Sequence, residues 1–209
     1  PTKEELGLPK SGFVFCAINQ GYKIKNPEFD IWMRLLSKVE GSVLWLKSEN
    51  KWMVLNLQNE AQKRGIDPSR LVFAKYINHE QYLAQFKQAD LYLDTFNYNA
   101  GTTASDVLIA GLPIVTKIGE TYASRMAASL LNAAGMRELI TKTAGEYENL
   151  ALELAVNSSK LSKFRECLQK RLKASPIFNT KLYTRNLERG YCEAYNFYSS
   201  GKRPQNIHI

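Results

Sequence analysis

The fold is decided by residues 90–113, which read DLYLDTFNYNAGTTASDVLIAGLP. The apolar beginning predicts a buried strand, the polar middle predicts a loop, and Gly101-Thr102-Thr103 predicts the start of a helix. The first N–H groups of a helix have no partner within it, so such a helix start can bind an anion. The hydroxyl groups of Thr102 and Thr103 add donors, and Asp106 follows one turn later. We therefore hypothesise that this loop holds the diphosphate of a nucleotide.

Short apolar segments alternate with helical patterns on both sides of this stretch. Further strands are expected at residues 13–18, 42–46, 70–74, 113–116 and 138–140. Further helices are expected at residues 27–39, 50–64, 79–88, 120–134, 144–157, 158–174 and 179–200. This alternation predicts an α/β fold, a Rossmann-like parallel sheet with helices on both faces. The loops after parallel strands share one edge of the sheet, where ligands bind. Gln20, Lys23, residues 76–79 and residues 97–106 are therefore expected to meet there.

Composition narrows the class of protein. The chain has 209 residues, of which 44% are apolar, as is typical of soluble globular proteins. No apolar run approaches the roughly 20 residues that span a bilayer. Cys16, Cys167 and Cys192 are interpreted as reduced thiols in a cytoplasmic protein, with no metal site. The polar beginning resembles no signal peptide and lacks an initiator Met, so we expect a fragment of a longer protein.

The net charge of +8 raises the possibility of nucleic-acid binding. Much of the excess lies between Lys160 and Arg189, at helical spacing among apolar residues. This pattern favours a solvated helix face, so nucleic acid is not the partner we expect. A basic surface could equally face a phosphorylated cofactor or an acidic partner domain.

Several common catalytic motifs do not occur in the sequence. A P-loop, a Gly-x-Gly-x-x-Gly fingerprint and a Gly-x-Ser-x-Gly nucleophile elbow are all absent. The remaining candidates are transferases that use a nucleotide-linked donor without a covalent intermediate.

Five ordered segments resemble the C-terminal catalytic lobe of the O-linked N-acetylglucosamine transferase family, which includes the SPINDLY proteins and bacterial proteins with tetratricopeptide repeats. They are residues 15–24, 42–46, 94–106, 119–129 and 178–183. The resemblance implies the C-terminal lobe of a GT-B glycosyltransferase, with a nucleotide-sugar-binding lobe at residues 1–175. The C-terminal helix and tail, residues 176–209, would belong to the same domain.

The implied function is inverting transfer of N-acetylglucosamine from UDP-N-acetylglucosamine to a protein Ser or Thr, without a metal or other cofactor. GDP-fucose is an open alternative for the donor. The general base and the groove for the protein or peptide acceptor would lie in an N-terminal lobe and repeats outside this chain. We therefore expect the isolated fragment to be inactive.

The resemblance also implies roles for individual residues. Gln20 and Lys23 would lie near the diphosphate, with Lys23 as the catalytic group that neutralises the charge of the leaving nucleotide. Thr102 and Thr103 would bind the phosphates, and Asp106 would hold the ribose hydroxyls. The base would meet the backbone of Tyr76 and Ile77.

The chain departs from the family pattern at four positions. Gly101 replaces a common His beside the phosphates, and His79 replaces a Lys found in animal enzymes. Tyr82 and Gln85 replace a His and an Arg, although Tyr82 could stack on a base. The departures at Gly101, Tyr82 and Gln85 motivate the alternative of a non-catalytic relative that acts as a scaffold or protein-interaction module.

Overall fold

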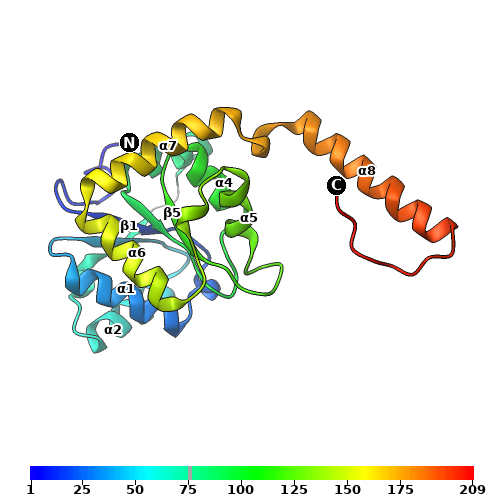
Figure 1. Cartoon of the computed structure of the whole chain (residues 1–209). Helices are drawn as coiled ribbons and strands as arrows, with labels where there is room; N and C mark the ends of the chain where they lie inside the picture. Colours follow the sequence, from blue (N-terminus) through cyan, green and yellow to red (C-terminus); the bar gives the residue numbers. More distant parts are fainter. Residues whose placement is uncertain (75–76) are drawn as a thin grey trace.

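The computed structural model describes residues 1–74 and 77–209 (Figure 1). The strands are β1 (Val14–Ala17), β2 (Val43–Lys47), β3 (Leu71–Ala74), β4 (Leu91–Leu93), β5 (Ile114–Lys117) and β6 (Ile140–Thr141). The helices are α1 (Asn26–Lys38), α2 (Lys51–Lys63), α3 (His79–Gln85), α4 (Thr102–Ile109), α5 (Met126–Ala133), α6 (Ala144–Val156), α7 (Ser158–Ala174) and α8 (Thr180–Ser199).

The strands form one parallel sheet in the order β3-β2-β1-β4-β5-β6. This confirms the predicted α/β class. The order reverses between β1 and β4, which pair through Phe15–Leu91 and Cys16–Tyr92. Every residue of these two strands is buried, as the continuous apolar runs predict for strands covered on both faces. In open parallel sheets, the crevice at such a reversal is the usual place for a ligand.

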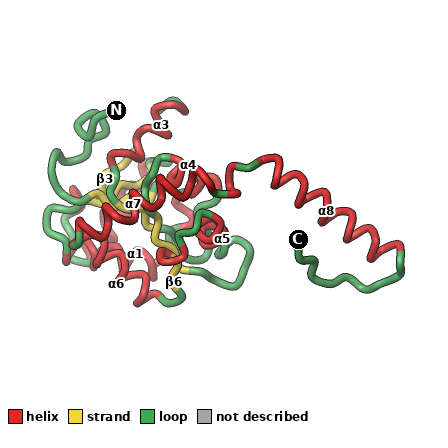
Figure 2. The backbone as a smooth tube through the Cα atoms, turned by 45° about the horizontal axis from the view of Figure 1, so that its top comes forward, coloured by secondary structure: helices red, strands yellow, loops and turns green. Residues whose placement is uncertain are grey.

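Helices cover both faces of the sheet. Figures 1 and 2 show α1, α2 and α6 on one face and α3, α4 and α5 on the other. Helix α1 begins with Pro27 in its first turn and buries Phe29, Trp32 and Leu36 against the sheet, as their helical spacing predicts. Helix α7 packs against α6 and α4 and so connects the two layers.

A chain of hydrogen bonds crosses the core beneath α1 and α6. Trp32 Nε1 donates to Tyr147 Oη at 3.2 Å, and Tyr147 Oη donates to the main-chain oxygen of Asp94 at 3.0 Å. All three residues are almost completely buried. Buried polar groups need such partners, so the bonds fix the end of β4 to the helical layer.

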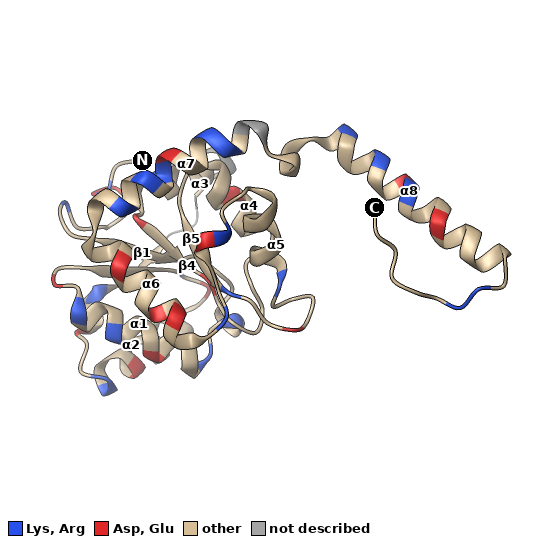
Figure 3. Ribbon diagram, viewed as in Figure 1, with Lys and Arg blue, Asp and Glu red and all other residues tan. Residues whose placement is uncertain are grey.

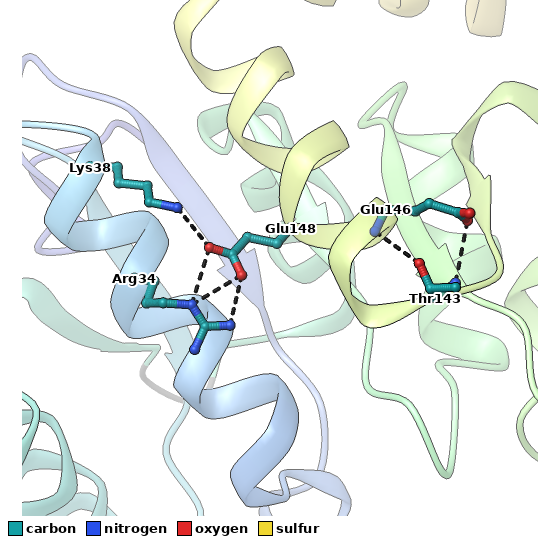
Figure 4. Close-up of polar contacts among 5 residues, drawn as sticks. All are labelled: Arg34, Lys38, Thr143, Glu146 and Glu148. Atoms are coloured by element: carbon teal, nitrogen blue, oxygen red, sulfur yellow. Dashed lines mark hydrogen bonds and ion pairs between the residues drawn. The ribbon is translucent and has the colours of Figure 1, made fainter.

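Polar contacts at the surface fix α6 to α1 (Figure 4). Glu148 accepts hydrogen bonds from Arg34 Nη2 at 2.6 Å and from Lys38 Nζ at 2.8 Å. Thr143 and Glu146 form a capping box at the start of α6, which satisfies otherwise unpaired N–H groups. The contacts with Glu148 hold the Glu148 pKa at about 2, mainly through the hydrogen bond from Arg34.

Several predicted boundaries are wrong. Helix α3 ends at Gln85 instead of residue 88, since a 3₁₀ turn occupies Phe86–Gln88. Helix α5 begins at Met126 instead of residue 120, because Thr121 and Ser124 hydrogen-bond to each other and to their own backbone in a turn. Strand β6 lies at Ile140–Thr141 instead of residues 138–140, since a 3₁₀ turn occupies Arg137–Leu139.

Helix α8 projects away from the sheet (Figure 1). Its tyrosines at 183, 191, 195 and 198 are exposed by 66 to 81%. Basic side chains line α7, while the sheet region carries charges of both signs (Figure 3). Among the described residues, no helix combines the length and the apolar character needed to span a membrane.

Candidate functional site

One cavity lies at the carboxyl ends of β1, β2 and β3 and beside the loop after β4, next to the reversal of strand order between β1 and β4. Its volume is about 630 Å³. Gln20 and Lys23 enter it from the loop after β1, Lys47 from the end of β2, and Thr102 and Thr103 from the start of α4. The cavity therefore combines positive charge with the donor groups of a helix N-terminus, which suits a bound anion.

The loop between β4 and α4 is organised by a buried carboxylate. Asp94 accepts hydrogen bonds from the amides of Thr95, at 2.9 Å, and Ala100, at 2.7 Å, and from the Thr116 hydroxyl, at 2.7 Å. Its side chain is completely buried, and this burial raises the Asp94 pKa from 3.8 to about 7. These bonds bind both ends of the loop segment 95–100 to one carboxyl group.

The same loop holds Lys23 in place. The Lys23 ammonium donates to the main-chain oxygen of Asn99 at 3.1 Å and lies 4.1 Å from the centre of the Tyr98 ring. Lys23 is only 9% exposed, and burial lowers its pKa while the charge of Asp94 opposes that shift. A lysine ammonium carries three donors, and the bond to Asn99 uses one of them. Lys23 is thus a nearly buried cation with donor capacity, on the wall of the cavity.

A further bond joins the loops after β1 and β4. Asn19 Nδ2 donates to Thr95 Oγ1 at 3.3 Å, and Thr95 Oγ1 donates to the main-chain oxygen of Tyr98 at 2.6 Å. Asn99 Nδ2 also donates to the Thr95 oxygen at 2.6 Å. The loop that supplies Lys23 and the loop that leads to the start of α4 are therefore connected by hydrogen bonds.

Helix α3 closes the cavity beside α4. Tyr82 is half-buried; burial raises its pKa, and a hydrogen bond with Thr103 opposes the rise. The Tyr82 ring packs edge-on against Phe86, with centroids 5.1 Å apart. Thr103 is therefore fixed by an aromatic neighbour, whereas Thr102 is exposed at the helix start.

Gly101 lies against the side chain of Met126. A Cβ atom at position 101 would approach Met126 Cε to 2.7 Å, so the thioether fills the space that a larger residue would need. A second cavity, of about 860 Å³, begins at the same place and extends between α4 and α5 to Tyr183. Met126 thus lies between the two cavities.

The structure brings most of the predicted site residues together. Seven of them line the first cavity: Gln20, Lys23, Ile77, Tyr82, Gly101, Thr102 and Thr103. Asp106 does not line it; it is half-buried one turn further along α4, close enough to Tyr82 for its charge to affect the Tyr82 pKa. Tyr76 lies outside the described residues, as does the side chain of His79, whose backbone begins α3.

Several residues of the site are missing from the prediction. Lys47 and Met126 line the cavity, Asn99 accepts the hydrogen bond of Lys23, and Asp94 holds the amide of Ala100 next to Gly101. Only Asp94 has a sequence signal, a carboxylate directly after an apolar strand. In residues 1–74 and 77–209, no group of three or more His, Cys, Asp or Glu side chains has the arrangement of a metal site.

Comparison with known proteins decides the family. The model of glycosyl transferase family 41 matches residues 1–187. The chain belongs to this family. It is 34% identical, over its full length, to the probable UDP-N-acetylglucosamine–peptide N-acetylglucosaminyltransferase SEC of Arabidopsis thaliana. A Caenorhabditis elegans UDP-N-acetylglucosamine–peptide N-acetylglucosaminyltransferase is also 34% identical, over 96% of the chain. The chain spans only 22% and 17% of the lengths of these relatives.

Solved structures agree with this assignment. An O-GlcNAc transferase variant from Thermobaculum terrenum superposes with a TM-score of 0.81 at 29% identity, covering 86% of this chain and 35% of that one. The sucrose-phosphate synthase of Thermosynechococcus elongatus shares the fold, with a TM-score of 0.63 at 14% identity, over 92% of this chain and 48% of its own. This member of family 41 is therefore a GT-B-like lobe that ends in long helices.

Proposed function

We propose that this chain is the nucleotide-sugar-binding lobe of an inverting glycosyltransferase that moves N-acetylglucosamine from UDP-N-acetylglucosamine to a protein Ser or Thr. One observation carries the proposal: Lys23, Thr102 and Thr103 come from the two sides of the strand reversal and line the same cavity. The names of the relatives support the choice of donor.

The chemistry requires stabilisation of a leaving group. When the acceptor hydroxyl attacks the anomeric carbon, the bond to the diphosphate breaks and negative charge grows on its oxygens. The ammonium of Lys23 and the free N–H groups at the start of α4 are already oriented, so they stabilise this charge with little reorganisation. Lys23 acts as the catalytic cation, and Thr102 and Thr103 bind the phosphates.

The remaining roles are those that the family resemblance implies. Gln20 lines the cavity after β1 and would contact the diphosphate. Asp106, one turn further along α4, would hold the ribose hydroxyls. Ile77, Tyr82 and the segment at Tyr76 and His79 would surround the base. An N-terminal lobe and repeats would supply the general base and the acceptor groove, so we expect this chain alone to bind the donor without turnover.

Calorimetric titration of the chain with UDP and GDP tests the proposal. UDP is expected to bind, and Lys23→Ala is expected to weaken binding about 10- to 100-fold, the usual effect of losing a hydrogen bond to a charged group. Lys163→Ala is the matched control, because it removes the same charge from an exposed position on α7. Absence of heat with both nucleotides, or equal binding by the Lys23→Ala chain, would overturn the proposal.

A second candidate is a non-catalytic scaffold. Gly101 favours it, because the family pattern has an imidazole at this position beside the phosphates, whereas here Met126 Cε lies within 2.7 Å of where a Cβ atom would be. Incubation of the longer protein with UDP-N-acetylglucosamine and an acceptor peptide separates the two. Transfer of the sugar would exclude the scaffold, whereas donor binding without transfer would favour it.

A further inference from the structure

The aromatic ring of Tyr98 covers one side of the Lys23 ammonium. Lys23 Nζ lies over the ring, 4.1 Å from its centre, which is within the range of a cation–π interaction. The next residue, Asn99, accepts the hydrogen bond from Nζ through its main-chain oxygen at 3.1 Å. Two consecutive residues of the loop after β4 therefore hold the same cation, one through its ring and the other through its backbone.

Contacts from both loops fix the position of the Tyr98 ring. The Thr95 hydroxyl donates to the main-chain oxygen of Tyr98 at 2.6 Å. The amide of Asn99 donates to the main-chain oxygen of Ala123 at 2.9 Å. The ring of Tyr22, which follows β1, meets the Tyr98 ring edge-on, with centroids 6.1 Å apart. Tyr98 is 43% exposed and lines the cavity, so its ring forms an ordered part of the cavity wall.

Lys23 needs such support because a lysine side chain is flexible. Its ammonium stands on a four-carbon stem, and ordering that stem costs conformational entropy. A cation that is already in place when a ligand arrives avoids this cost at the moment of binding. The bond to Asn99 uses one of the three N–H groups of Lys23, so the ammonium can meet an anion in the cavity while it stays over the ring.

We propose that Tyr98 is a positioning residue, which holds the Lys23 ammonium at the cavity wall through the face of its ring, ready for the diphosphate of the donor. The inference rests on the proposed function and adds to it a residue that acts through Lys23. The attraction comes from the face of the ring and does not involve the hydroxyl group. Phenylalanine is therefore expected to replace Tyr98, whereas leucine is not.

Calorimetry with UDP compares the side chains at position 98. Tyr98→Phe keeps the ring and is expected to bind UDP within about 2-fold of the unaltered chain. Tyr98→Leu removes the ring and is expected to bind about 5-fold more weakly, the factor that corresponds to a cation–π interaction of ordinary strength. Tyr195→Leu is the matched control, because it makes the same change at an exposed position of α8 outside the cavity.

Unchanged UDP binding by Tyr98→Leu would overturn the inference and leave the proposed function standing. A loss in Tyr98→Phe as large as that in Tyr98→Leu would assign the effect to the hydroxyl group and would also overturn it. Failure of the unaltered chain to bind UDP would overturn the proposed function as well.

The electron density of the ring separates a cation–π interaction from packing. A chain with 3,4,5-trifluorophenylalanine at position 98 keeps an aromatic ring of similar shape, but its fluorine atoms withdraw electron density from the ring face. Relative to Tyr98→Phe, this chain is expected to bind UDP about 3- to 5-fold more weakly. Equal binding by the two rings would reduce Tyr98 to packing. Tighter binding by the fluorinated ring would mean that Tyr98 holds Lys23 away from the ligand, and either result contradicts the inference.

A double-mutant cycle tests whether Tyr98 acts through Lys23. Lys23→Met removes the charge and keeps much of the length of the side chain. In the Lys23→Met chain, Tyr98→Leu is expected to change UDP affinity less than about 2-fold, because no cation remains to be positioned. In a Thr102→Val chain, which lacks a hydroxyl group at the start of α4, Tyr98→Leu is expected to keep its effect of about 5-fold. An equal loss in both chains would mean that Tyr98 contacts the nucleotide directly, and the inference would fail.

Discussion

The pH dependence of stability provides a direct test of the buried carboxyl group of Asp94. Its side chain is completely buried at the end of β4, and it accepts hydrogen bonds from Thr95, Ala100 and Thr116. Burial outweighs these bonds and raises the Asp94 pKa from 3.8 to about 7. The perturbation is Asp94→Asn, which keeps an oxygen for the two loop amides and cannot ionise.

The direction in which stability changes with pH follows from the Asp94 pKa in the unfolded chain, 3.8, and in the folded chain, about 7. The folded chain binds this proton more tightly than the unfolded chain, so the stabilisation is complete below about pH 4 and is lost as the pH rises to about 7. One pH unit in this range corresponds to about 1.4 kcal/mol, and the roughly three units between the pKa values correspond to about 4 kcal/mol. The Asp94→Asn chain is expected to lack this slope.

Urea unfolding of both chains between about pH 4 and about pH 8 measures the effect. The difference in unfolding free energy between them cancels the contributions of other groups, including Glu28, whose pKa burial also raises. Glu166→Gln, on the exposed face of α7, controls for the change in charge. If the unaltered chain and Asp94→Asn lose stability in parallel as the pH rises, the argument about Asp94 is refuted.

Two further substitutions test the packing and the surface. Gly101→Ala is expected to lower the free energy of unfolding by less than about 1 kcal/mol, because the new methyl group meets the flexible end of Met126. A loss above about 3 kcal/mol, measured by urea unfolding, would mean that the Met126 thioether cannot move. Glu148→Gln is expected to cost about 1 to 2 kcal/mol at neutral pH, since Arg34 and Lys38 lose a charged partner. Because the pKa of Glu148 in the folded chain is lowered to about 2, its contribution to stability is lost as the pH falls from about 4.5 to about 2. If Glu148→Gln lowered the free energy of unfolding by the same amount at every pH in this range, this account would be contradicted.

Local patterns in the sequence predict the elements well. The apolar run before Asp94 and the Gly101-Thr102-Thr103 helix start predict β4 and α4 correctly, because the residues that mark these elements lie within a few positions of one another. The start of α5 is wrong because the hydrogen bonds between Thr121 and Ser124 compete with the helix. Such competition depends on side-chain geometry, which helical spacing does not report.

The sequence predicts the site only in part, because some of its contacts depend on side-chain geometry. Lys23 and Thr102 follow strands, so their common edge is predictable from a parallel sheet. The bond from Lys23 to Asn99 and the contact of Lys23 with the Tyr98 ring depend on how distant segments pack, and no local pattern encodes them. Asp94 could be suspected from its place after an apolar strand, but its three partners could not.

The pairing of β1 with β4 has a consequence for folding. Asn19 and Thr95 lie 76 positions apart in the sequence, as do Lys23 and Asn99, so each contact closes a long loop. The entropy of that closure opposes folding before either bond can form. The cavity thus lies between the half of the sheet formed by β1, β2 and β3 and the half formed by β4, β5 and β6. A nucleotide that contacts both halves would stabilise their association. At a concentration 100 times its Kd, such a ligand adds about 2.7 kcal/mol to the stability of the entire fold.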